Sequence, residues 1–129
     1  MSTDSAWQAW GEKDPYYGVI TDPKFRRAEL TAQAKKEFFD SGFAHVDYVL
    51  QMIRQHIAPA FSPSSVLDFG CGVGRLVVPF AKIAPEVVGM DVSTAMLEEA
   101  SRNCVEHSID NVQLCLSDDD LSSLVGAFN

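Results

Sequence analysis

The chain has 129 residues, 47% hydrophobic and 22% charged, a composition typical of one globular domain and not of a disordered or membrane-embedded protein. No apolar run approaches the ~18 residues of a membrane-spanning helix, and the first five residues lack the features of a secretory signal, so we expect a cytoplasmic protein. A net charge of −8, from 10 basic and 18 acidic residues, offers no surplus of Lys and Arg to neutralise phosphates, which argues against nucleic acid as a partner.

Residues 1–60 are expected to form an N-terminal arm followed by helices. The first twenty residues mix Trp and Tyr with polar residues, Gly and Pro, which indicates irregular structure. Asp22 and Pro23 resemble an N-cap and the first position of a helix, and this helix is expected to continue to about Phe39.

A second helix is expected to follow the first after a break. Ser41 and Gly42 interrupt the helical pattern and are interpreted as the cap of the next helix. Apolar residues then recur at steps of three and four over residues 43–57, which predicts one buried stripe. The prolines at 59 and 63 end the element.

The second half of the chain alternates between strands and helices. Short apolar runs at 65–69, 87–90 and 111–116 are typical of buried strands. The segments between them, 75–84 and 93–107, are typical of helices. This alternation predicts a parallel sheet with right-handed crossovers.

The first strand leads into a glycine-rich segment that carries the chemistry. Gly70, Gly72 and Gly74 alternate with other residues directly after the strand, where the chain must turn sharply and pass close to a ligand. The spacing differs from the G-x-G-x-x-G of dinucleotide binders. Asp68 precedes these glycines, and its negative charge disfavours a pyrophosphate but suits a cationic ligand.

A second carboxylate follows the next strand. Asp91 lies about 20 residues after the first glycine, at the end of the second predicted strand. A carboxylate in this place can accept hydrogen bonds from both hydroxyls of a ribose. The two acids and the glycines together therefore predict a ligand site at one edge of the sheet.

On these motifs the stretch from Val66 to Asp118 resembles the class I S-adenosylmethionine (SAM)-dependent methyltransferase family. The resemblance is carried by VLDFGCGVGR at 66–75 and GMDVSTAML at 89–97. It implies an α/β, Rossmann-like three-layer parallel sheet, preceded by an N-terminal helical segment. It also divides the chain into the N-terminal arm and helices, 1–60, and the first half of a SAM-binding domain, 61–129.

The resemblance implies a role for each residue of the glycine segment. Gly70 and Gly72 would pass under the methionine part of SAM, and Asp68 would help to hold its amino group. Asp91 would hold the ribose. Cys71 is expected among these cofactor-binding residues. The alternative is that it serves only as a small residue between two glycines.

The adenine end of the site is also implied by the resemblance. Val92 and Met96 would pack near the adenine, and Asp118, with Asp119 as its neighbour, would accept a hydrogen bond from the adenine amino group. Other interpretations stay open, because a methionine at helical spacing is often a core residue. The acidic run at 118–120 is also typical of a solvated loop.

The family fold has about seven strands, whereas this sequence supplies three, so we expect a fold truncated after the third strand. The exposed sheet edge could support an oligomer.

The expected function is methyl transfer to a small molecule or a protein, with the catalytic residues unknown. The alternatives are a non-catalytic SAM-binding or assembly module and, less favoured, an NAD-dependent oxidoreductase. Three cysteines without a C-x-x-C pair and three scattered histidines indicate no metal site.

Overall fold

The computed structural model describes residues 2–118. Three parallel strands form an open sheet in the order β1-β2-β3, with bounds Ser65–Phe69, Glu86–Asp91 and Val112–Leu116. Helix α4 (Val77–Ala81) connects the first two strands and α5 (Thr94–Glu106) the last two. This order confirms the expected parallel sheet with helical connections.

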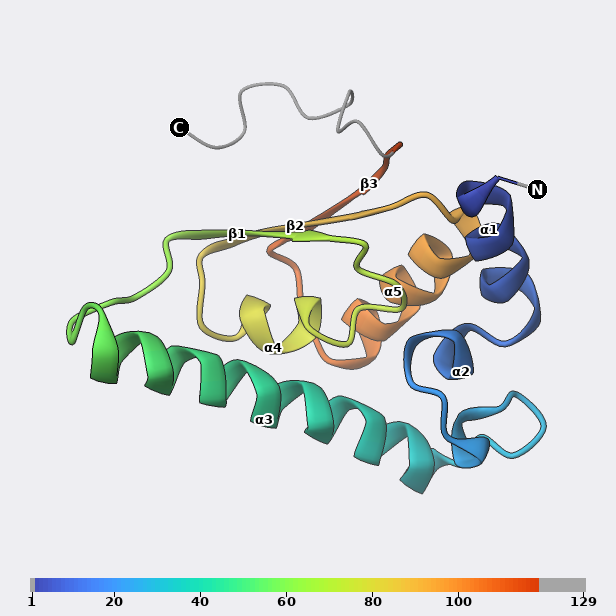
Figure 1. The fold of residues 1–129 in the computed structure, drawn as a ribbon, viewed down its shortest axis with the longest axis horizontal. Helices are drawn as coiled ribbons and strands as arrows, with labels where there is room; N and C mark the ends of the chain where they lie inside the picture. Colours follow the sequence, from blue (N-terminus) through green and yellow to red (C-terminus); the bar gives the residue numbers. More distant parts are fainter. Residues whose placement is uncertain (1, 119–129) are drawn as a thin grey trace.

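Both connecting helices lie on the same side of the sheet (Figure 1). Each crossover moves one strand further in the same direction, and right-handed crossovers then place their helices on one face. Strand β2 is paired on both edges, and its residues 87–90 are buried. Its near-continuous apolar run agrees with this burial.

The register brings the carboxyl ends of the three strands to one edge of the sheet. Phe69 at the end of β1 lies beside Met90, and Asp91 at the end of β2 lies beside Leu116. In open parallel sheets, ligands bind just outside these ends. The segments after β1 and β2 are therefore placed to share one site.

The N-terminal segment is helical, so the expected irregular arm was wrong. Helix α1 (Thr3–Lys13) begins after Ser2, whose side chain accepts from the backbone N–H of Ser5, and α2 (Pro15–Val19) begins with a proline. A proline at the first helical position loses no hydrogen bond. The expected helix from Asp22 to about Phe39 is divided in the structure. Asp22 caps the short 3₁₀ helix η1 (Pro23–Phe25), and residues 32–39 belong to the next helix, α3 (Ala32–His56).

The expected break at Ser41 and Gly42 was also wrong, because α3 is continuous over Ala32–His56. Gly42 faces the segment before α4: a Cβ on this residue would overlap the backbone carbonyl oxygen of Arg75. The Arg75 side chain donates to Ser41 Oγ (3.0 Å) and to Ser41 O (3.3 Å). The glycine therefore permits a close approach between α3 and the segment before α4.

One cluster of buried residues joins the N-terminal half to the second half. It contains Tyr16, Phe25, Ala34, Phe38, Phe39, Val73, Val78 and Met96. Phe38 is fully buried and makes edge-to-face contacts with three neighbouring aromatic rings, at centroid distances of 5.0–5.3 Å. Within residues 2–118, no helix is long and apolar enough to cross a membrane.

Candidate functional site

The segment after β1 turns back toward β2 through glycines in left-handed conformations. Gly70 has φ +79° and Gly72 has φ +54°, values that favour glycine. The backbone N–H groups of Gly70 and Cys71 both donate to the carbonyl oxygen of Met90, at 2.7 and 2.9 Å. The glycine pattern thus forms a tight loop, here called the glycine loop (residues 70–74), fixed to the end of β2.

Asp91 connects this loop to the start of α5. One oxygen of its carboxylate accepts from the N–H of Gly72 at 2.8 Å, and the other accepts from the N–H of Ser93 at 2.9 Å. Ser93 then caps α5, because its Oγ accepts from the N–H of Met96 at 3.2 Å. A carboxylate has about four acceptor sites, so Asp91 retains the capacity to accept from a diol.

A pocket of about 390 Å³ lies at this edge of the sheet. It is lined by residues from both halves of the chain: Trp7, Gly18, Val19, Phe69, Gly70, Gly72, Asp91, Val92 and Met96. The structure therefore brings together five of the residues that the sequence placed in a site. The lining is mainly apolar with one carboxylate, as is usual for small-molecule sites.

Asp68 lies on β1 beside this pocket and not in its lining. It pairs with Gly89 of β2 and is partly buried. Burial, together with the nearby charge of Asp91, raises the pKa of the Asp68 carboxyl above its usual range. A cation bound near both carboxylates would relieve this cost, whereas a phosphate would increase it.

Cys71 points into the protein interior. Its side chain is 5% exposed and packs in a cluster with Val77, Ala84, Val87 and Cys104. Burial raises the pKa of the thiol, and the charges of Asp68 and Asp91 act in the same direction. The thiol is thus held protonated, and only the backbone of Cys71 belongs to the glycine loop.

The described residues that were expected at the adenine end do not all lie together. Val92 and Met96 line the pocket. Met96 is also a core residue with 2% exposure, and its contact with an adenine stays a prediction. Asp118 is exposed, two residues beyond β3. Asp119 lies outside the described residues.

Sequence reasoning missed the pocket residues Trp7, Gly18, Val19 and Phe69. Phe69 was assigned only to its strand, and the other three belong to a segment expected to be irregular. The available signal was the Ser-x-x-Ser start of α1 and the proline at the start of α2. Neither pattern indicates that these helices reach a site some fifty residues further along the chain.

Residues 66–127 match a protein family with the description "Methyltransferase domain". The chain is 29% identical over 128 residues to the 23S rRNA (uracil(1939)-C(5))-methyltransferase RlmD of Marinomonas sp. (strain MWYL1). This alignment covers 88% of the chain and 29% of that protein. The chain is also 32% identical over 78 residues to an uncharacterized RNA methyltransferase of Thermosynechococcus vestitus, covering 60% of the chain and 17% of that protein.

Solved structures share the fold. The phosphoethanolamine N-methyltransferase 1 of Haemonchus contortus superposes with a TM-score of 0.60 and 18% identity, over 88% of this chain and 20% of that one. The magnesium protoporphyrin IX methyltransferase of Synechocystis PCC 6803 gives 0.57 and 23%, over 89% and 49%. At these identities the likeness shows the fold alone. The chain spans less than a third of the length of the two curated relatives described above.

These relatives correct one expectation from the sequence. The acidic composition argued against nucleic acid as a partner, but matched proteins from Marinomonas, Colwellia and Shewanella are 23S rRNA methyltransferases. Net charge describes the whole chain, whereas affinity for nucleic acid depends on where the basic groups lie. The bulk charge was therefore the wrong quantity on which to exclude RNA.

Proposed function

We propose that this chain, which matches a methyltransferase domain over residues 66–127, is a class I SAM-dependent methyltransferase, that its pocket binds SAM and that the protein transfers the methyl group to an acceptor. The observation that carries the proposal is the convergence of the glycine loop and Asp91 on a 390 Å³ pocket. Asp68 adds a second carboxylate beside it. Two carboxylates next to an apolar pocket suit a ligand with an amino group, a sulfonium and a ribose.

In this proposal each part of the cofactor has its own residues. Gly70 and Gly72 lie under the methionine part, with the backbone of Cys71 between them, and Asp68 holds the ammonium group. Asp91 accepts from the ribose hydroxyls with the lone pairs that Gly72 and Ser93 leave free.

The adenine lies near Val92 and Met96, which line the pocket beyond Asp91. Asp118 accepts a hydrogen bond from the adenine amino group, and the participation of Asp119 in this contact stays a prediction.

The division of the chain into 1–60 and 61–129 is likewise a proposal, and the cytoplasmic location stays a prediction.

SAM supplies an electrophilic methyl group on a sulfonium sulfur. The acceptor's nucleophilic atom forms a bond to the methyl carbon as the carbon–sulfur bond breaks, and the electron pair of that bond stays on sulfur. Such a reaction depends mainly on positioning the acceptor in line with the methyl group. Within residues 2–118 we assign no general base.

For the acceptor we propose RNA, since the relatives that resemble this chain over most of its length carry RNA methyltransferase names. The test is incubation of the protein with SAM labelled in the methyl group and with total RNA. Label that becomes acid-precipitable and is released by ribonuclease supports RNA. Label found in protein or in small molecules would contradict an RNA acceptor while leaving methyl transfer intact.

Cofactor binding is tested separately by thermal unfolding. A ligand that binds only the folded state stabilises it by about 2.7 kcal/mol at a hundred times its dissociation constant. SAM and S-adenosylhomocysteine should raise the melting temperature, and NAD should not. A shift with NAD alone would favour the oxidoreductase alternative. Binding of SAM without transfer to any acceptor would favour a non-catalytic module.

A further inference from the structure

The pocket takes part of its lining from the N-terminal helices. Trp7 comes from α1, and Gly18 and Val19 come from α2. Trp7 is 44% exposed, and Phe69, on the β1 side of the same pocket, is 48% exposed. Exposed aromatic side chains that share a mainly apolar pocket are typical of a binding surface.

Helix α1 lies directly against the segment that joins β2 to α5 (Figure 1). A Cβ on Gly11 would overlap Ser93 Oγ and would come within 3.1 Å of Met96 Cγ, so glycine permits this close contact. One turn earlier, Gln8 Nε2 donates to the backbone carbonyl of Val92 at 3.3 Å. Trp7, which precedes Gln8 on this helix, lines the pocket together with Val92.

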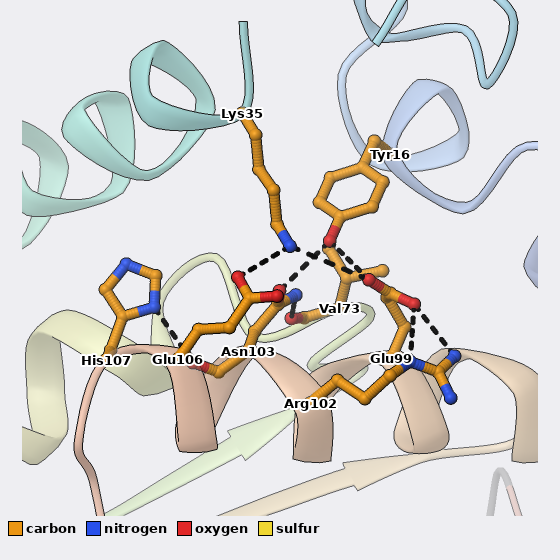
Figure 2. A network of polar contacts seen from close by, with 8 residues as sticks. All are labelled: Tyr16, Lys35, Val73, Glu99, Arg102, Asn103, Glu106 and His107. Atoms are coloured by element: carbon orange, nitrogen blue, oxygen red, sulfur yellow. Dashed lines mark hydrogen bonds and ion pairs between the residues drawn. The ribbon is translucent and has the colours of Figure 1, made fainter. Parts of the chain in front are cut away.

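Helix α2 is held in place by a polar network that reaches the glycine loop (Figure 2). The Tyr16 hydroxyl shares its proton between Glu99 Oε1, at 2.7 Å, and Asn103 Oδ1, at 3.1 Å. The Asn103 amide then donates to the carbonyl oxygen of Val73 at 2.9 Å. At the end of α2, a Cβ on Gly72 would lie 2.9 Å from a Val19 methyl group. The helix and the loop are thus positioned by the same contacts.

Packing of α1 alone does not account for the indole of Trp7. Gly11 is the buried residue of this helix, whereas Trp7 stays largely exposed. A large aromatic side chain at an exposed position contributes little to a core, but it offers a flat apolar surface to a ligand. The exposed part of the Trp7 indole is therefore available to a ligand in the pocket.

We propose that α1 and α2 form one wall of the cofactor site and that the Trp7 indole packs against the adenosyl part of the bound cofactor. This inference rests on the proposed function, because it needs SAM or S-adenosylhomocysteine in the pocket. The adenosyl part is the appropriate partner because Trp7 shares the pocket lining with Val92 and Met96, next to which the adenine is proposed to lie. A stacked or edge-on indole excludes water from the base and adds to the affinity.

The chain has two tryptophans, which allows each to be observed alone. The Trp10→Phe variant retains Trp7, and Trp7→Phe retains Trp10, which is similarly exposed at 38% but is not part of the pocket lining. Each variant is titrated with S-adenosylhomocysteine, and fluorescence excited at tryptophan-selective wavelength is followed with and without iodide as a quencher. Affinity for the same ligand is measured by calorimetry for the wild type, Trp7→Ala and Trp10→Ala.

Three results are expected: ligand shields Trp7 from iodide, Trp10 keeps its quenching, and Trp7→Ala weakens binding about tenfold with little change in melting temperature. If calorimetry shows normal binding to Trp7→Ala, or if iodide still quenches Trp7 in the complex, the inference is wrong although SAM binding stands. If the folded wild type binds no S-adenosylhomocysteine, the proposed function fails first and takes this inference with it.

Discussion

The carboxylate of Asp91 accepts a hydrogen bond from the backbone N–H of Gly72 at 2.8 Å, across nineteen residues of sequence. This contact joins the two segments that the sequence motifs had marked separately. Asp91 therefore has a structural role beside its proposed contact with the ribose, because it fixes the loop that is proposed to lie under the cofactor.

Replacing Asp91 should affect both stability and binding. Asp91→Ala leaves the N–H groups of Gly72 and Ser93 without their acceptor, and we expect a loss of about 1–3 kcal/mol in the free energy of unfolding. Binding of S-adenosylhomocysteine should weaken by at least about tenfold through loss of charge-assisted bonds to the ribose. Urea unfolding and calorimetry measure the two effects. Glu98→Ala, which removes an exposed carboxylate of α5, is the control and should change neither.

Asp68 should show the opposite relation between stability and binding. Burial and Asp91 raise its pKa above the ordinary 3.8, so its ionisation costs the folded state stability. This cost is absent below pH 3.8, where the Asp68 carboxyl is protonated in the folded and in the unfolded protein. It grows as the pH rises through the raised pKa of the folded protein. Asp68→Asn should therefore be more stable than the wild type at pH 7 and equally stable in acid, yet bind SAM more weakly.

Denaturant unfolding of Asp68→Asn and the wild type across this pH range measures the difference. A variant that is less stable than the wild type at pH 7 would contradict the account. So would an unchanged affinity for SAM, since the ammonium group would then have another partner.

The Tyr16 hydroxyl should stabilise the protein mainly while Glu99 is ionised. Burial opposes ionisation of Glu99, but hydrogen bonds from Tyr16 and Arg102 outweigh it and lower the pKa of this carboxyl. The stabilisation is present above the pKa of Glu99 in the unfolded chain, ordinarily 4.5, and is lost as the pH falls through the lower folded value. Tyr16→Phe should cost about 1–3 kcal/mol at pH 7 and less in acid.

Tyr17→Phe is the matched control for this variant. The Tyr17 ring contacts the Trp10 ring at a centroid distance of 5.8 Å and lies 4.0 Å from the Arg26 guanidinium. Loss of its hydroxyl should leave the pH dependence of unfolding unchanged. Equal effects of the two substitutions at every pH would show that the network around Glu99 is not the cause.

Gly42→Ala tests the close approach of α3 to the segment before α4. In a free helix this change favours the fold by up to about 1 kcal/mol. Here the added Cβ would overlap the Arg75 carbonyl, a backbone atom that cannot rotate away, so we expect a net loss of about 1–3 kcal/mol. The sign of the change in melting temperature therefore decides between helix propensity and packing.

Much of the sheet edge that carries the pocket could be predicted, because the sequence patterns that indicate it are local. The glycines at 70 and 72 need positive φ, and Ser93 caps α5, features that a few consecutive residues encode. The three strands are short apolar runs and were found within one residue at each end. Local patterns of this kind need no knowledge of distant contacts.

The N-terminal part depended on contacts between distant residues. In the sequence, Gly42 is typical of a helix break. In the structure it packs against Arg75, thirty-three positions further on. Trp7 lies in a mainly polar helix, and the position of this helix depends on the close contact between Gly11 and Ser93. Such tertiary contacts override local propensity, so neither the continuous α3 nor the wall formed by α1 could be read from the sequence.

Calorimetric titration of the folded chain with S-adenosylhomocysteine, beside the Asp91→Ala variant and with NAD as a control, tests the central claim most directly. The account predicts saturable binding at one site, at least about tenfold weaker binding to the variant, and no heat with NAD. Absence of binding to a sample whose circular dichroism and cooperative melting show it to be folded would contradict the claim that this pocket is a SAM site.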